Sequence, residues 1–91
     1  MNVQIYSKPN CPYCVQAKQL LKANKVIYEE IELNFGQTPA QGNILMEVAD
    51  FKAANPGVAS MPQIFINGNR IGGFTELKSL FEAKVQTQQT L

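Results

Sequence analysis

Residues 7–14 constrain the fold of this chain more than any other stretch. They read SKPNCPYC and contain both of its cysteines, Cys11 and Cys14. Before this stretch, Val3 and Ile5 alternate with polar residues, as in a strand with one face on a core. After it, apolar residues recur at helical spacing, and a proline stands where a helix would begin. Two thiols at a strand-to-helix junction are typical of a thiol-disulfide exchange site.

Two other interpretations of the cysteine pair are weaker. A tetrahedral zinc site needs four ligands, and a chain with two cysteines and no histidine cannot complete the usual set. We therefore predict no metal site. The pair could also be two small buried apolar side chains, but its spacing and setting favour exchange chemistry.

Composition sets the remaining limits. The 91 residues suffice for one domain, which we expect to span residues 1–85, with a polar tail at 86–91. A net charge of +1 without a basic stripe predicts neither nucleic acid nor an anionic membrane as a partner. No apolar run approaches the roughly 20 residues of a membrane-spanning helix, and no signal-peptide pattern is visible. We therefore expect a cytoplasmic protein, and in such a reducing compartment a cysteine pair is more often catalytic than structural.

Hydrophobic spacing and turn residues predict an α/β fold with the order β-α-β-α-β-β-α. Asn43 is expected to cap the second helix, after a loop at 34–42. The predicted strands lie near 3–6, 25–33, 62–66 and 69–71, and the predicted helices near 12–24, 43–54 and 75–84.

Two connections determine the predicted sheet. A β-α-β crossover requires parallel strands, whereas the dipeptide Asn67-Gly68 predicts a hairpin turn between antiparallel strands. The sheet should therefore be mixed, with four strands flanked by three helices that cover both faces. The acidic residues Glu29, Glu30 and Glu32 are interpreted as a solvated sheet edge, with steering of a partner as the alternative.

Three separated segments together resemble a dithiol glutaredoxin of the thioredoxin fold. They are YSK followed by CPYC within residues 6–14, SMPQIFI at 60–66 and IGGFTE at 71–76. The resemblance covers residues 1–85, and the combination is highly specific although each segment alone would be weak. Thioredoxins usually carry Gly-Pro between their cysteines and a tryptophan before them, and this chain has no tryptophan. The compact length and the loop at 34–42 are similar to those of viral or bacterial glutaredoxins.

The resemblance implies a glutathione-dependent thiol-disulfide oxidoreductase, with glutathione as co-substrate and no tightly bound cofactor. Cys11 would be the nucleophile and would alone reduce glutathione mixed disulfides, whereas Cys14 would be the resolving thiol that protein disulfides require. An ordinary thiol with a pKa of about 8.5 is only about 3% thiolate at pH 7, so the site must favour the anion. The amides of Tyr13 and Cys14 and the charge of Lys8 are expected to do so.

Two further segments are implied to bind glutathione. The Met61-Pro62 bond is expected to be cis, so that the backbone of Met61 faces the dithiol and pairs with an extended thiol peptide. Glycines 72–73 would leave the amides of the next helix start free to bind the γ-glutamyl carboxylate. The predicted glutathione-binding residues are Lys8, Tyr13, Met61, Pro62, Gly73, Phe74, Thr75 and Glu76.

The chain departs from the family pattern at two points. Thr75 stands where many relatives have an acidic residue for the amino group of glutathione, and Glu76 is expected to take over that role. The glycyl carboxylate should meet Lys8, but the family's further basic or glutamine partner is missing. Lys52 and Gln63 are the candidate replacements, and we predict weaker glutathione binding than in typical relatives.

Three competing functions remain open. The nearest is a thioredoxin-like reductase that receives electrons from a flavoprotein. A carrier of a glutathione-ligated [2Fe-2S] cluster is the second, although cluster-binding relatives commonly have glycine where this chain has Pro12. A non-catalytic binding module is disfavoured by the presence of both cysteines and Lys8. By resemblance we expect a monomer whose partners are glutathione and glutathionylated or disulfide-containing proteins, such as ribonucleotide reductase.

Overall fold

The computed structural model describes the backbone of residues 2–90 and the side chains of residues 2–83. Within them, no helix combines the length and the apolar character needed to cross a membrane. The strands are β1 (Val3–Ser7), β2 (Glu29–Leu33), β3 (Ile44–Met46), β4 (Gln63–Ile66) and β5 (Asn69–Gly72), and the helices are α1 (Pro12–Ala23), α2 (Val48–Ala54) and α3 (Phe74–Thr90).

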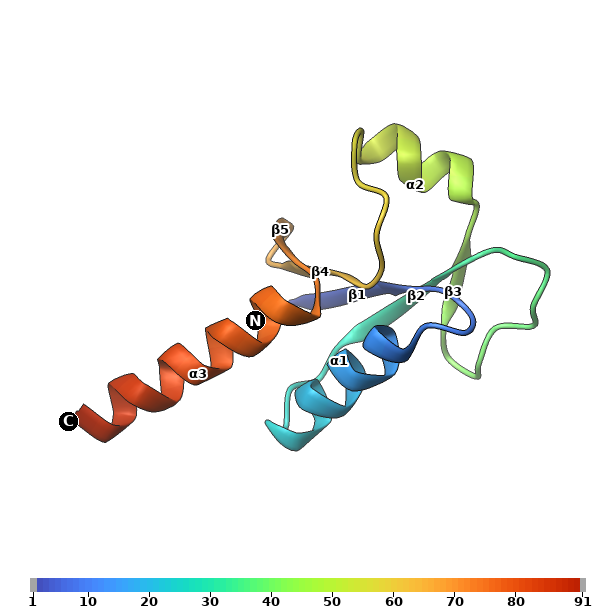
Figure 1. Ribbon diagram of the computed structural model, residues 1–91. Coiled ribbons are helices and arrows are strands. Elements are labelled where there is room, and N and C mark those ends of the chain that lie inside the picture. The colour runs from blue at the N-terminus through green and yellow to red at the C-terminus, as the bar shows by residue number, and fades with distance from the viewer. Residues whose placement is uncertain (1, 91) are drawn as a thin grey trace.

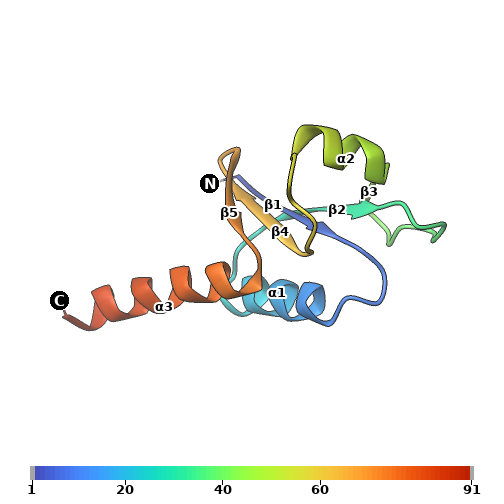
Figure 2. The same ribbon diagram turned by 45° about the horizontal axis from the view of Figure 1, so that its top comes forward.

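The five strands form one mixed sheet in the order β3-β2-β1-β4-β5. β1 and β3 both pair with β2 in parallel, whereas β4 pairs antiparallel with β1 and with β5. Figures 1 and 2 show α1 and α3 on one face of the sheet and α2 on the other. The predicted thioredoxin-like arrangement of a mixed sheet and three helices is confirmed, with one strand more than expected.

The main hydrophobic core lies between the sheet and the helices α1 and α3. On the opposite face, the ring of Tyr6 packs against Phe51 of α2 and Phe65 of β4, with ring centroids 5.1 and 5.2 Å apart. Both faces of β1, the strand that leads to the cysteine pair, are therefore packed. The buried core residues next to α1 and α3 are Val3, Ile5, Ala17, Leu21, Ile64 and Leu77.

The prediction of one helix over residues 43–54 is wrong in its first half. Residues Ile44–Met46 form β3, which pairs with Ile31–Leu33, and α2 begins only at Val48. Asn43 caps no helix, because its side chain donates a hydrogen bond to Glu32 instead. A short apolar run satisfies helical spacing and strand pairing equally well, so periodicity alone could not separate the two.

The second strand begins later than expected. α1 ends at Ala23, and Lys25 adopts a left-handed conformation with φ 58°, which a regular strand cannot contain. The amide of Val26 then donates to the carbonyl of Leu21, closing the helix end. The chain therefore enters β2 at Glu29 and not at Lys25.

The hairpin and the last helix complete the fold. Asn67 and Gly68 have φ values of 51° and 82°, as a two-residue turn between antiparallel strands requires, so this prediction is confirmed. α3 continues to Thr90, past the end predicted near residue 84. The separate polar tail at 86–91 stays a prediction, since the side chains of 84–90 and residue 91 lie outside the described residues.

Candidate active site

The cysteine pair lies at the N-terminus of α1, where β1 turns into the helix. Cys11 is the N-cap residue and Pro12 takes the first helical position, where its missing N–H costs no hydrogen bond. Cys11 and Cys14 form a disulfide, with Cα atoms 5.2 Å apart. The amide of Cys14 donates to Sγ of Cys11 at 3.2 Å, and it is the one hydrogen bond donated to this sulfur within residues 2–90. Cys11 is 8% exposed and Cys14 only 2%, so Cys11 is the sulfur nearer to solvent.

The loop before β4 lies against the dithiol. The Met61-Pro62 peptide bond is cis, as predicted. The carbonyl oxygen of Met61 is 3.8 Å from Sγ of Cys11. A backbone acceptor therefore stands beside the more exposed sulfur, although the two residues are far apart in the sequence.

A groove of about 420 Å³ runs from this loop to the start of α3. We call it the α3 groove. It contains every residue predicted to bind glutathione except Lys8. Its lining residues are Tyr13, Ser60, Met61, Pro62, Gln63, Arg70, Ile71, Gly72, Gly73, Phe74, Thr75 and Glu76.

The start of α3 forms one end of the α3 groove. The carboxylate of Glu76 folds back and accepts a hydrogen bond of 2.7 Å from the amide of Gly73. Gly72 has φ 122°, and a side chain there would collide with Glu76. The rings of Tyr13 and Phe74 lie 6.0 Å apart, so an aromatic wall connects the dithiol to the helix start.

The structure argues against Gln63 as a replacement partner for the glycyl carboxylate. Gln63 is buried, its side-chain nitrogen donates to the carbonyl and the hydroxyl of Ser60, and its oxygen accepts from Arg70. Lys52 lies exposed on α2. Sequence reasoning missed Arg70, whose guanidinium is brought to the α3 groove by Gln63. The position of Arg70 follows from the pairing of β5 with β4, which the sequence predicted. No sequence motif contains Arg70, so motifs alone could not identify it.

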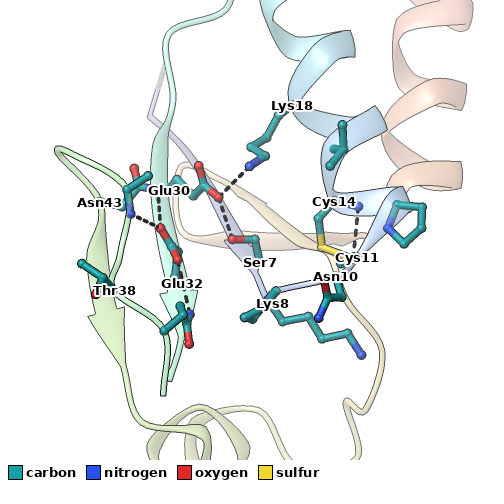
Figure 3. A pocket seen from close by; sticks show the side chains of 15 residues that line it. Ser7, Lys8, Asn10, Cys11, Cys14, Lys18, Glu30, Glu32, Thr38 and Asn43 are labelled. Atoms are coloured by element: carbon teal, nitrogen blue, oxygen red, sulfur yellow. Dashed lines mark hydrogen bonds and ion pairs between the residues drawn. A yellow bond between two sulfur atoms is a disulfide. The ribbon is translucent and has the colours of Figure 1, made fainter. Parts of the chain in front are cut away.

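A second groove, of about 690 Å³, lies on the other side of the dithiol (Figure 3). We call it the β2 groove. It separates the N-terminal half of α1 from the loop between β2 and β3. Lys8, predicted for the glutathione site, lines this groove and not the α3 groove. The β2 groove is lined by residues 7–12, 14, 15, 18, 30, 32, 37, 38, 40 and 43.

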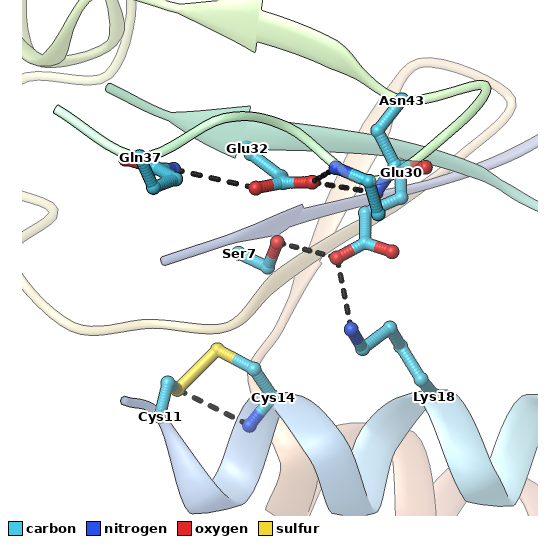
Figure 4. A network of polar contacts seen from close by, with 9 residues as sticks. Ser7, Cys11, Cys14, Lys18, Glu30, Glu32, Gln37 and Asn43 are labelled. Carbon is cyan, nitrogen blue, oxygen red and sulfur yellow. Dashed lines mark hydrogen bonds and ion pairs between the residues drawn. A yellow bond between two sulfur atoms is a disulfide. The ribbon is translucent and has the colours of Figure 1, made fainter. Parts of the chain in front are cut away.

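Glu30 forms the centre of a polar network in the β2 groove (Figure 4). The hydroxyl of Ser7 donates to Oε2 of Glu30 at 2.7 Å, and Nζ of Lys18 donates to the same oxygen at 3.0 Å. The side chain of Glu30 is 11% exposed. The interpretation of Glu30 and Glu32 as a solvated edge is therefore wrong, because β2 is an interior strand covered by β3. Glu29 alone is exposed.

Glu32 holds the loop that forms the far wall of the β2 groove. Its carboxylate accepts hydrogen bonds from the backbone of Ala40 and from the side chains of Asn43 and Gln37. Partial burial raises the pKa of Glu32, but these hydrogen bonds and the charge of Lys18 outweigh burial and hold the pKa below its ordinary value. Glu32 is thus ionised near neutral pH and stabilises the loop.

Known proteins are similar to this chain in sequence and in fold. The glutaredoxin family profile matches residues 3–71. Glutaredoxin 1 of Rickettsia bellii is 42% identical over 76 residues, which are 84% of this chain and 72% of that protein. Glutaredoxin 3 of Escherichia coli is 38% identical over 79 residues, which are 87% and 84% of the two chains. The chain belongs to the glutaredoxin family.

A solved structure agrees with this assignment. The crystal structure of glutaredoxin 1 from Francisella tularensis, complexed with cacodylate, has a TM-score of 0.65 to this glutaredoxin at 29% identity. The alignment covers 93% of this chain and 96% of that one. With a CPYC dithiol at the start of α1, this glutaredoxin is a thiol-disulfide oxidoreductase. The roles predicted for individual site residues stay predictions.

Proposed function

We propose that this glutaredoxin uses glutathione to reduce protein-glutathione mixed disulfides and protein disulfides through Cys11 and Cys14. The observation that supports this most is the α3 groove, which leads from Met61, whose carbonyl oxygen is 3.8 Å from Sγ of Cys11, to the start of α3. Its dimensions suit a small peptide, and its two ends offer different chemistry. A cysteine sulfur bonded to Cys11 would leave the rest of its peptide lying along this groove.

The reaction follows from the different exposure of the two sulfurs. The Cys11 thiolate attacks the disulfide of a glutathionylated protein, the protein thiolate leaves, and glutathione stays bonded to Cys11. A second glutathione thiolate then attacks this bond, releasing oxidised glutathione and restoring the Cys11 thiolate. For a protein disulfide, Cys14 instead attacks the bond between Cys11 and the protein, and the internal disulfide forms.

Recognition of glutathione is proposed to use backbone groups in the α3 groove. The backbone of Met61 would pair with the cysteinyl unit, and the amides of Phe74 and Thr75 would bind the γ-glutamyl carboxylate at the start of α3. Glu76 keeps a second carboxylate oxygen that can accept from the α-ammonium group. Arg70 adds a positive charge near the same end.

The glycyl carboxylate of glutathione has fewer candidate binding partners than the γ-glutamyl end. Lys8 and Lys52 are the candidate cations, because the amide of Gln63 is already committed to Ser60 and Arg70. Weaker glutathione binding than in typical relatives therefore stays a prediction. The protein partners are proposed to include a disulfide-recycling enzyme such as ribonucleotide reductase, and the protein to act as a monomer in the cytoplasm.

Single cysteine variants test this proposal. Cys14→Ser should keep glutathione-dependent reduction of a glutathionylated peptide and lose reduction of the disulfides of insulin, whereas Cys11→Ser should lose both. Wild-type turnover with glutathione and glutathione reductase should exceed turnover with a thioredoxin reductase flavoprotein. Equal loss of both activities in Cys14→Ser, or faster turnover with the flavoprotein, would count against the proposal.

A further inference from the structure

When Cys14 attacks a mixed disulfide at Cys11, its thiol proton needs an acceptor that the proposed reaction does not yet identify. To close the internal disulfide, Cys14 must attack as a thiolate, so its thiol has to lose a proton at that moment. Cys14 is only 2% exposed, and direct contact with bulk solvent is therefore small. This chain has no histidine to act as an ordinary base near neutral pH. A proton acceptor on the inner side of the dithiol could take up this proton.

Ser7 and Glu30 lie on that side. Both line the β2 groove together with Cys14, and Figure 4 shows Ser7 between the disulfide and Glu30. Ser7 is 3% exposed and donates its only hydroxyl hydrogen to Glu30 at 2.7 Å. A hydroxyl has one hydrogen and two lone pairs, so the hydroxyl of Ser7 can still accept a hydrogen from Cys14. Glu30 thus orients Ser7 as an acceptor.

The other charged groups around Glu30 do not serve this purpose. Lys18 donates to Oε2 of Glu30, the same oxygen that accepts from Ser7, and within the described side chains no hydrogen bond ends on Oε1. The carboxylate of Glu32 already accepts hydrogen bonds from Gln37, Ala40 and Asn43 of the loop. Glu30 borders the β2 groove and a second hollow between α1 and the loop at 40–43. Besides Glu30 and the two cysteines, the titratable residues that line them are Lys8, Lys18, Lys22, Tyr28, Glu29 and Glu32.

We infer that Ser7 and Glu30 form a proton relay for the resolving cysteine. The sulfur of Cys14 attacks the sulfur of Cys11 in a mixed disulfide, the new S–S bond forms, and the departing sulfur takes the electron pair of the old one. Cys14 is oxidised and the departing sulfur is reduced. The proton of Cys14 passes to the hydroxyl of Ser7, the proton of Ser7 passes to Glu30, and water in the β2 groove carries it away. The reverse sequence returns a proton to Cys14 when the internal disulfide is reduced.

A two-phase reaction tests the relay without glutathione, so its outcome is independent of the proposed glutathione dependence. Reduced protein is mixed with a limiting amount of 5,5′-dithiobis(2-nitrobenzoic acid) in a stopped-flow instrument. In the first phase Cys11 attacks and releases one coloured aryl thiolate. In the second phase Cys14 displaces the other, and this phase alone requires the proton of Cys14 to leave. Each trace therefore contains its own control for an intact Cys11 site.

Glu30→Gln keeps the size of the side chain and an oxygen that accepts from Ser7, but it cannot take up a proton. We expect Glu30→Gln and Ser7→Ala to slow the second phase about tenfold or more and to leave the first phase within about twofold. The expected loss lies below the roughly 10²- to 10⁴-fold typical of general bases because water in the groove can replace the relay in part. Glu30→Asp should restore part of the rate. The matched control is Glu32→Gln, on the same strand and groove, which should leave both phases nearly unchanged.

The pH dependence separates a relay from a structural role. With the relay, the second-phase rate should change little between about pH 6 and 8, whereas in Glu30→Gln it should rise about tenfold per pH unit, because only the ionised fraction of Cys14 then reacts. Slowing of both phases in Glu30→Gln, equal slowing in Glu32→Gln, or a second phase that keeps the wild-type rate and pH profile in Glu30→Gln would each overturn the inference.

Discussion

The two grooves on either side of the dithiol are built from different chemical groups, and Cys11 itself lines only the β2 groove. The α3 groove presents backbone groups, such as the carbonyl of Met61 and the amides at the start of α3, with aromatic rings beside them. The β2 groove instead presents charged side chains that project from an interior strand, above all Glu30 and Glu32. The α3 groove depends mainly on the path of the backbone, with Arg70 and Glu76 as its charged side chains, whereas the β2 groove depends mainly on ionised side chains.

This difference determines how each groove responds to substitutions and to pH. The backbone groups at the start of α3 keep their position only while Gly72 keeps its unusual dihedral angle. The α3 groove should therefore be more sensitive to added side chains than to pH, although the carboxylate of Glu76 also belongs to it. Side-chain carboxylates tolerate small changes of the backbone but lose their hydrogen bonds when they are protonated. The following three predictions test this contrast, beginning with the largest expected effect.

Gly72→Ala should damage the α3 groove and spare the β2 groove. An added Cβ would lie 2.7 Å from the side chain of Glu76, and φ is 122°, so both the backbone and Glu76 must move. Strain of this kind costs on the order of 1–3 kcal/mol of unfolding free energy. The Michaelis constant for a glutathionylated peptide should rise severalfold, whereas the second phase of the aryl disulfide reaction should stay near the wild-type rate.

Gly68→Ala is the matched control for this variant. Gly68 has φ 82°, also in the left-handed range, but nothing lies within 4 Å of an added Cβ, and the residue is at the other end of β5. It should lower the thermal unfolding midpoint without changing the Michaelis constant. If both variants raised the Michaelis constant equally, a general loss of stability would explain the result. The contact between Gly72 and Glu76 would then have no specific role in binding glutathione.

The sequence predicted the α3 groove much better than the β2 groove. The α3 groove is made of short contiguous motifs, SMPQIFI and IGGFTE, whose turns and helix start are local properties of the chain. The β2 groove arises from strand register, since Ser7 pairs with Glu32 and Ile5 with Glu30 across β1 and β2. No local pattern encodes which strand becomes the neighbour of another.

The wrong helix at residues 43–46 and the wrong solvent exposure of Glu30 and Glu32 have the same cause, the strand β3. Ile44, Leu45, Val48 and Ala49 recur at helical spacing, which hides β3 and leaves β2 as a sheet edge whose glutamates face solvent. With β3 paired on its outer side, β2 is an interior strand, and Glu30 and Glu32 project beneath α1 and the loop. The alternation of these glutamates with buried Ile31 and Leu33 could not reveal this, because alternation is typical of a strand with one solvated face.

Lys8→Ala should raise the pKa of the Cys11 thiol, an effect of intermediate size. Lys8 is exposed and lies on the β2 side of the dithiol, so its charge acts on the Cys11 thiolate through a well-solvated space. Exposed pairs contribute about 0.2–1 kcal/mol, which moves the midpoint of the iodoacetamide alkylation rate against pH upward by about half a unit. Lys22→Ala, which removes the same charge farther along α1, should not move the midpoint. An unchanged midpoint in Lys8→Ala would remove Lys8 from the activation of Cys11.

Glu32→Gln should have the smallest effect on activity and the clearest dependence on pH. The pKa of Glu32 in the folded protein lies below the ordinary value of 4.5, so the folded state binds this proton less readily than the unfolded state. Its contribution to stability is therefore complete above about pH 4.5 and is lost as the pH falls through the lower folded pKa. The thermal unfolding midpoint of wild type should exceed that of Glu32→Gln near neutral pH, and the gap should narrow in acid. Glu29→Gln, an exposed change on the same strand, should show no such narrowing. A gap that stayed constant from pH 7 to 3 would mean that Glu32 holds the loop by packing, and the β2 groove would then resemble the α3 groove in depending on shape and not on charge.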